Sequence, residues 1–224
     1  MLNTSVDTLI FDLDNTLIDR NEALRITVSN WLQEQGLEAT QIIPALDDIM
    51  RYDDWGYTDR TDFCDWLLHN YHGPKSNGIT TPDFQFWLMK NIPFHVQPNL
   101  AANEALSLVK SKYRLVLATN GSSINQRNKL ERAQLLSFFQ PDDIFISGEL
   151  GIDKPDPLFY KKIIERMQLN TARAMMIGDN PVNDVQAAQT EGLLTCWVSY
   201  NRPAPDNLNA SQVITNITEI TTWM

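Results

Sequence analysis

The chain has 224 residues, of which 43% are hydrophobic and 21% are charged, and its formal net charge at pH 7 is −10. This composition is typical of a globular protein that buries its own core. The acidic charge argues against nucleic acid or an anionic membrane as a partner, because polyanions are bound by positive surfaces. Cys64 and Cys196 lie far apart and suggest reduced thiols rather than a disulfide. We therefore expect a cytoplasmic protein, a monomer or weak homodimer, with no nucleic-acid or membrane partner.

Short apolar runs predict the strands of a parallel sheet. Runs that are apolar without strict alternation are typical of parallel strands covered on both faces. Helical periodicity separates them, which indicates crossover connections and an α/β, doubly wound, Rossmann-like core. In chain order the predicted strands lie within residues 7–14, 114–118, 143–146, 174–177 and 194–198.

The spacing between the strand ends indicates an inserted unit. From Thr119 to Lys154 there are 35 positions, and from Lys154 to Asp179 there are 25. Each fits one crossover of about 30 residues. The 103 positions from Thr16 to Thr119 are too many for one crossover. We therefore predict that residues 1–18 and 95–224 form the core and that 19–94 form an inserted helical cap, with helices over 22–35, 61–71 and 82–91.

Polar residues follow the predicted strands, where open α/β sheets bind ligands. They are carboxylates, hydroxyls, an amide and one lysine, which suit a hard divalent cation and a phosphoryl group. Carboxylates this close together cannot all stay ionised without a cation, so we expect Mg²⁺. One carboxylate could then attack phosphorus. The candidates are Asp12, Asp14, Thr16, Thr119, Asn120, Lys154, Asp179 and Asp184.

Four segments in order resemble the motifs of the haloacid dehalogenase (HAD) superfamily. They read FDLDNTL at 11–17, ATNG at 118–121, GIDKPDP at 151–157 and IGDNPVND at 177–184. The resemblance extends from residue 8 to about 198, and the inserted unit is similar to the cap of subfamily I. The form of the second motif and residues 145–149 are similar to the pyrimidine 5′-nucleotidase and N-acylneuraminate-9-phosphatase branch.

The resemblance implies a role for each candidate residue. Asp12 would be the nucleophile, and Asp14 would be the general acid and then the general base. Substrate phosphate would be bound by Thr119, Asn120 and Lys154. The Mg²⁺ ligands would be Asp12, the main-chain carbonyl of Asp14, and Asp179. Thr16 and Asp184 would support them, Asp184 also as a ligand through water.

Asp14 favours phosphatase chemistry, because an alkoxide leaving group needs a proton and a halide does not. A 2-haloacid dehalogenase, a phosphomutase, a receiver domain and a non-catalytic phosphate-binding regulator remain as alternatives. A closing cap favours a small phosphorylated metabolite as substrate. A nucleoside 5′-monophosphate is the first expectation, and a sugar phosphate, including a phosphorylated acylneuraminate, is the second.

Two further expectations concern the cap. Its acidic pairs at 47–48 and 53–54 suggest a solvated face. Its aromatic residues are spaced as in a helical core; they are Trp55, Tyr57, Trp66, Phe84, Phe86 and Trp87.

Overall fold

The computed structural model describes residues 6–73 and 78–223. By its internal contacts the chain divides into two compact units, one of Met1–Ile18 and Pro98–Met224 and one of Asp19–Gln97. In the described part of the chain, no helix is long and apolar enough to cross a membrane.

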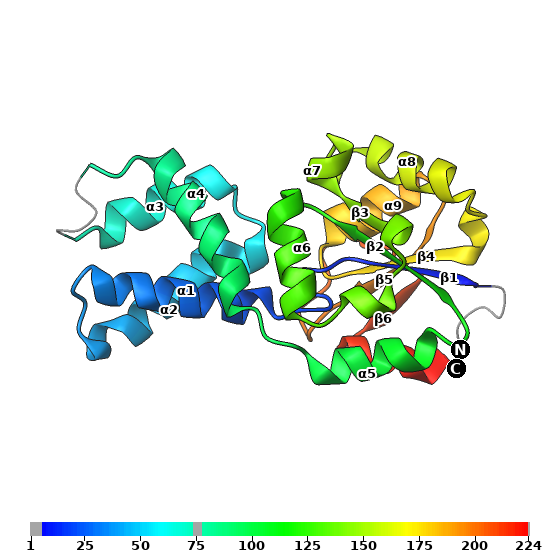
Figure 1. The fold of residues 1–224 in the computed structure, drawn as a ribbon, viewed down its shortest axis with the longest axis horizontal. Coiled ribbons are helices and arrows are strands. Elements are labelled where there is room, and N and C mark those ends of the chain that lie inside the picture. The colour runs from blue at the N-terminus through cyan, green and yellow to red at the C-terminus, as the bar shows by residue number, and fades with distance from the viewer. Residues whose placement is uncertain (1–5, 74–77, 224) are drawn as a thin grey trace. The chain divides into compact units, whose positions relative to one another are not determined.

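The first unit contains a six-stranded parallel sheet with the order β3-β2-β1-β4-β5-β6 (Figure 1). The predicted α/β fold class is therefore confirmed. Each strand pairs in parallel with its neighbours. The strands are β1 (Thr8–Phe11), β2 (Arg114–Thr119), β3 (Ile144–Ile146), β4 (Ala174–Gly178), β5 (Leu194–Val198) and β6 (Gln212–Ile214).

The last strand, β6, was not predicted. It has three residues, and the side chain of Val213 in its middle is 55% exposed. A run this short at the edge of a sheet carries no hydrophobic pattern.

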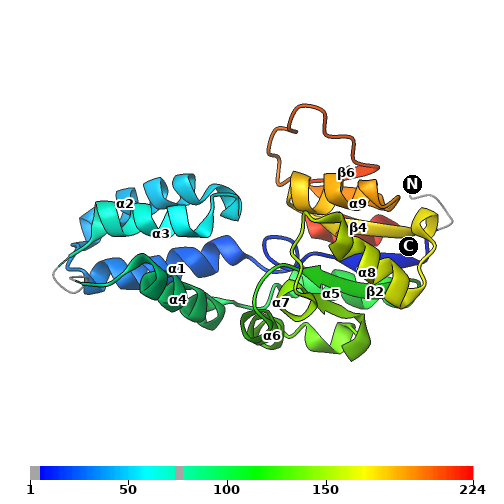
Figure 2. The ribbon, with the colours of Figure 1, turned by 90° about the horizontal axis from the view of Figure 1, so that it is seen from above.

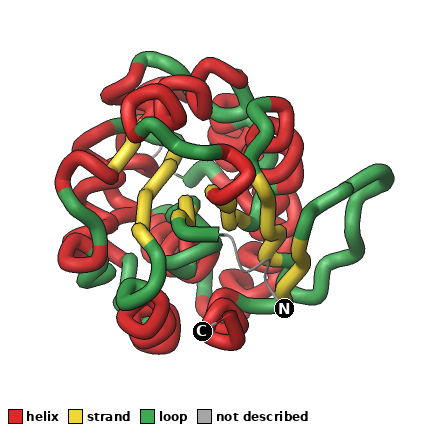
Figure 3. Tube along the Cα trace, turned by 90° about the vertical axis from the view of Figure 1, so that its right-hand side faces the viewer, coloured by secondary structure: helices red, strands yellow, loops and turns green. Residues whose placement is uncertain are grey.

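Helices pack on both sides of this sheet (Figure 3). They are α5 (Leu100–Val109), α6 (Ser123–Arg132), α7 (Ser147–Leu150), α8 (Pro157–Met167) and α9 (Ala187–Thr190). On one side, Phe159 and Ile163 of α8 pack with Ile10 and Met176 of the central strands in one fully buried cluster. The strand order reverses between β1 and β4, so the sheet opens to a ligand at the carboxyl ends of these two strands.

The second unit is helical. Its main helices are α1 (Arg20–Glu34), α2 (Ala39–Asp53), α3 (Arg60–Tyr71) and α4 (Thr81–Asn91). Side-chain caps begin three of them: Asp19 at α1, Asp59 at α3 and Thr80 at α4. These three helices coincide closely with the predicted ones. Helix α2 was missed, and it contains Pro44, a residue that ordinarily interrupts a helix.

The expected solvated face at residues 53–54 is wrong for Asp53. Its side chain is fully buried at the end of α2 and accepts from both terminal nitrogens of Arg20, including a bond of 2.9 Å from Nη2 to Oδ1. Arg60 adds a contact of 3.3 Å. Burial alone would raise the pKa of Asp53, but the two guanidinium groups outweigh it and lower the pKa below 3.8.

The aromatic residues of this unit do not all form a core. Phe84 is buried and lies 4.8 Å from the ring of Trp31. Phe86, in contrast, is 71% exposed and Tyr57 is 38% exposed. The prediction is therefore right for Phe84 and wrong for Phe86 and Tyr57.

Candidate active site

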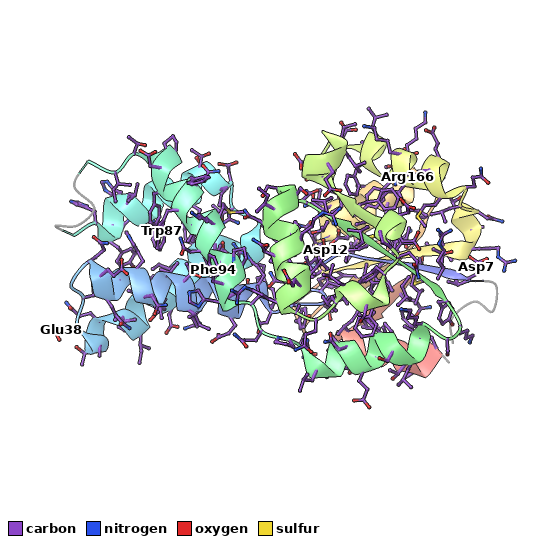
Figure 4. All side chains as sticks on the ribbon, viewed as in Figure 1. Asp7, Asp12, Glu38, Trp87, Phe94 and Arg166 are labelled. Carbon is purple, nitrogen blue, oxygen red and sulfur yellow. The ribbon has the colours of Figure 1, made fainter. Side chains whose placement is uncertain are left out.

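Asp12 follows directly after β1, at the carboxyl edge of the sheet. Its backbone N–H donates to the carbonyl of Ile177 at 2.9 Å, which extends the pairing of β1 with β4 by one residue. The chain then turns out of the sheet, and the N–H of Leu17 donates back to the carbonyl of Leu13 at 3.0 Å. Asp12 is 7% exposed and lies inside its unit, whereas Asp7 before the same strand lies at the periphery (Figure 4).

Lys154 makes hydrogen bonds to three separate segments of the chain. Its Nζ donates to Oδ1 of Asp12 at 2.8 Å, to Oδ1 of Asp184 at 2.7 Å and to the carbonyl of Ala118 at 3.0 Å. The lysine is 4% exposed. A lysine buried this deeply needs paired charges, and here two carboxylates supply them.

Asn120 holds the backbone of the loop that carries this lysine. Its Oδ1 accepts from the N–H of Lys154 at 2.8 Å, and its Nδ2 donates to the carbonyl of the same residue at 2.7 Å. Both ends of the amide are therefore engaged by Lys154. The structure places Asn120 behind the lysine, in the position of a support for the loop.

Three carboxylates form a group that could hold a metal ion. One oxygen from each of Asp12, Asp179 and Asp184 lies within 4.8 Å of the others, and all three residues are buried. Asp184 lies within a turn of π-helix at Pro181–Gln186, and its Oδ2 accepts from the N–H of Asn180 at 3.0 Å.

Gly178 makes room for this arrangement. A Cβ at this position would lie 2.2 Å from Oδ2 of Asp184, closer than any real contact allows. The glycine in the fourth motif is therefore required because the carboxylate of Asp184 packs directly against the end of β4.

The crowded carboxylates perturb one another. Burial and the neighbouring carboxylate of Asp184 raise the pKa of Asp12 to about 7, against the lowering effect of Lys154. Burial, together with Asp12 and Asp184, also raises the pKa of Asp179 well above 3.8. Burial would lower the pKa of Lys154, but the same carboxylates outweigh it and raise that pKa well above its usual range. One lysine is thus too little positive charge for three ionised carboxylates.

Asp14 lies outside this group and faces α6. Both of its carboxylate oxygens accept from Nζ of Lys129 at 2.7 Å, and Oδ2 also accepts from Nε2 of Gln126 at 3.0 Å. The same Nε2 donates to the hydroxyl oxygen of Thr119 at 2.7 Å. Thr119 itself is buried at the end of β2. A side chain from α6 therefore connects two of the predicted site residues.

Thr16 lies in the turn that follows Asp14 and is 1% exposed. Its hydroxyl oxygen has no hydrogen-bond partner among residues 6–73 and 78–223.

Arg202 and Trp197 both donate hydrogen bonds to the backbone of Asp179. The loop 199–211 projects from its unit (Figure 2), but Arg202 near its start donates through Nη2 to the carbonyl of Asp179 at 2.8 Å. The same nitrogen lies 3.4 Å from Oδ2 of Asp179. Nε1 of Trp197 donates to that carbonyl at 2.9 Å.

Gln126, Lys129 and Arg202 were not among the residues predicted for the site. A signal for the first two is present in the pattern of α6. Gln126, Lys129 and Leu130 share one face, while Ile124 on the same helix is 74% exposed. Polar residues on the inward face of an amphipathic helix indicate partners in the interior. No comparable pattern marks Arg202.

The chain matches the haloacid dehalogenase-like hydrolase family over residues 6–192. Among relatives, it is 27% identical to the pyrimidine 5′-nucleotidase PynA of Streptococcus pneumoniae over 91% of this chain and 87% of that protein. It is 25% identical to the glyceraldehyde 3-phosphate phosphatase of Pyrococcus furiosus, over 96% of this chain and 91% of that protein.

Among solved structures, the fold resembles the magnesium-bound putative HAD-hydrolase YfnB of Bacillus subtilis. The TM-score is 0.78 and the sequence identity 22%, over 98% of this chain and 99% of that one. The family match spans strands β1 to β4, the acidic group and Lys154 together. The chain therefore belongs to the haloacid dehalogenase-like hydrolases.

Proposed function

We propose that the protein is a Mg²⁺-dependent phosphomonoester hydrolase that forms an aspartyl-phosphate on Asp12. The observation that carries the proposal is the buried group at the switch point of the sheet, where Asp12 lies beside Asp179, Asp184 and Lys154. The names of the two relatives support it, since each describes the removal of phosphate from a small molecule.

The donor set fits Mg²⁺. All three side chains offer carboxylate oxygen, the donor that hard divalent cations prefer. The raised pKa values of Asp12 and Asp179 also indicate a site that lacks positive charge. When bound, Mg²⁺ would neutralise these carboxylates and polarise a phosphoryl oxygen. We propose Asp12, Asp179 and the main-chain carbonyl of Asp14 as its ligands. Asp184 would contribute directly or through water.

The side chains divide the reaction into two steps. In the first, an oxygen of Asp12 attacks phosphorus, the bond from phosphorus to the leaving oxygen breaks, and Asp14 gives that oxygen its proton. In the second, Asp14 takes a proton from water, the water oxygen attacks phosphorus, and the carboxylate of Asp12 is released. Lys154 and the hydroxyl of Thr119 bind phosphoryl oxygens during both steps.

We propose a nucleoside 5′-monophosphate as the substrate, with a sugar phosphate as the second candidate. The nucleotidase relative supports the first and the triose-phosphate phosphatase relative supports the second. The helical unit Asp19–Gln97 would act as the cap that selects among small metabolites. We also propose a cytoplasmic location, supported by the two free, buried thiols.

The test is phosphate release from about fifty phosphorylated metabolites, with Mg²⁺ and with EDTA. Activity should require the metal, and Asp12→Asn should lower turnover by about 10⁴ or more while the protein stays folded. Asp7→Asn is the matched control, because it changes the same residue type before the same strand in an exposed position and should leave activity unchanged.

Two results would contradict the proposal. Retention of more than about a hundredth of the activity in Asp12→Asn would exclude this residue as the nucleophile. Strong preference for a sugar phosphate, with nucleotides at background, would exclude the nucleotidase assignment but keep the phosphatase.

A further inference from the structure

Helix α6 turns two polar side chains toward the interior. Gln126 is 1% exposed and Lys129 is 4% exposed, although both residue types are ordinarily found at the surface. They are three positions apart and so lie on the same face of the helix. Ile124, meanwhile, is 74% exposed. A helix that buries a lysine and exposes an isoleucine loses the free energy of hydrophobic burial. The burial of Gln126 and Lys129 must therefore be explained by their polar contacts.

Lys129 anchors the carboxylate of Asp14 from its inner side. Its Nζ lies 2.7 Å from both oxygens, which holds the carboxylate in position. The side chain of Asp14 is 25% exposed, whereas that of Lys129 is 6% exposed. The aspartate therefore keeps an accessible side while the lysine holds it from behind.

Gln126 ties the same carboxylate to Thr119. An amide nitrogen carries two protons, and here one is donated to Oδ2 of Asp14 at 3.0 Å and the other to Oγ1 of Thr119 at 2.7 Å. Because Oγ1 accepts this bond, the hydroxyl proton of Thr119 points away from the amide nitrogen, and its contact with the carbonyl of Asn120 is long, at 3.5 Å. Gln126 thus leaves the hydroxyl of Thr119 able to donate to a ligand.

Gly121 permits this placement. A Cβ there would lie 3.0 Å from Cδ of Gln126, and the residue has a φ of +136°. The glycine of the second motif therefore leaves space for the amide of Gln126 to lie between Thr119 and Asp14.

We propose that Lys129 and Gln126 are positioning residues of this enzyme: Lys129 fixes Asp14 for proton transfer to the leaving group, and Gln126 orients Thr119 toward the phosphoryl group. This inference rests on the proposed phosphatase function, and it adds two residues from a helix that carries none of the four motifs.

The central test compares Lys129→Met with wild type on phenyl phosphate and p-nitrophenyl phosphate. The value of kcat/KM covers the steps up to departure of the leaving group. Phenoxide is the more basic leaving group and depends more on a proton donor. If Lys129 acts through Asp14, the variant should lose at least about tenfold more kcat/KM on phenyl phosphate than on p-nitrophenyl phosphate. Lys129→Arg, which keeps the charge, should restore part of that difference.

A double-mutant cycle supplies the second readout. In the Asp14→Asn background, Lys129→Met should lower kcat/KM by less than about twofold, because its partner is already gone. Asn128→Met is the matched control on the same helix: it changes an exposed neighbour and should lower kcat/KM equally little on both substrates.

Gln126→Met should weaken inhibition by inorganic phosphate about threefold or more, and it should do so only where Thr119 is intact.

The possible results separate the two proposals. If wild type hydrolyses neither aryl phosphate nor any of the phosphorylated metabolites, the proposed function fails and this inference with it. Activity of wild type together with inactivity of Asp12→Asn would support the proposed function. If Lys129→Met then loses the same factor in kcat/KM on both esters, and if its effect adds to that of Asp14→Asn, only the inference about Lys129 fails. If Lys129→Met does not fold, the dependence of Gln126→Met on Thr119 decides the matter.

Discussion

Replacing Lys154 by methionine should destabilise the protein strongly when no metal is present. Methionine has nearly the same length but removes the charge that lies 2.8 Å from Asp12 and 2.7 Å from Asp184. Each hydrogen bond to a charged group contributes about 1.5–3 kcal/mol, and removing one member of a buried ion pair costs about 3–5 kcal/mol. The two figures describe the same loss and are not added. We expect about 3–5 kcal/mol, a fall in Tm of about 6–20 °C for a chain of this size.

The assay is urea unfolding of wild type and Lys154→Met, in EDTA and in Mg²⁺. The variant leaves the three carboxylates without their lysine, so Mg²⁺ should stabilise the variant more than wild type. Lys161→Met is the control, because this lysine is exposed on α8 and its loss should cost within about 0.5 kcal/mol. The reasoning is refuted if Lys154→Met costs less than about 1 kcal/mol in EDTA, or if Mg²⁺ stabilises both proteins equally.

Three further predictions concern Gly178, Asp12 and Asp53. Gly178→Ala should displace the carboxylate of Asp184 and destabilise the protein by about 1–3 kcal/mol. It should also lower the affinity for Mg²⁺ measured by calorimetry, and an unchanged affinity would contradict the contact between Asp184 and the end of β4. In metal-free protein the raised pKa of Asp12, about 7, makes the stability contributed by this group fall as pH rises from about 4 to about 7. The gain in Tm from Mg²⁺ should therefore be larger at pH 8 than at pH 5, and a gain independent of pH would contradict this. The lowered pKa of Asp53 contributes stability that is present above 3.8 and lost as pH falls below it. Asp53→Asn should thus cost about 3–5 kcal/mol at pH 7 and flatten the acid limb of unfolding followed by tryptophan fluorescence.

The sheet was largely predictable because of its own burial. Strands β1, β2 and β4 are covered on both faces, so their sequences are nearly continuous apolar runs. Strand β6 lies at the edge, and its three residues are half-buried, exposed and buried in order, which is too short a run to form a pattern. The predictable part of the fold is therefore the part where burial continues over several residues.

The site was predictable for a related reason. Asp12, Thr119 and Asp179 come directly at the ends of buried strands, so the local sequence tells which edge of the sheet they occupy. Asn120 shows the limit of that inference. Its position after a strand did not indicate that its amide is engaged on both sides by the backbone of Lys154.

The residues that were missed are polar groups whose partners lie far away in the chain. Lys129 and Asp14 are separated by 115 positions, and the pairing of Asp53 with Arg20 spans 33. In both cases the charged residue lies on a helix, where a solvated face is the ordinary interpretation of such a residue. A local pattern can show that a lysine or an aspartate points inward, as the exposed Ile124 does for α6. The local pattern cannot identify the oppositely charged partner, because the partner lies on another element and reaches this residue only through tertiary packing. An unpaired buried ion costs several kcal/mol, so neither member of such a pair can be buried without the other. The position of each charged residue can therefore be explained only once the tertiary structure shows its partner.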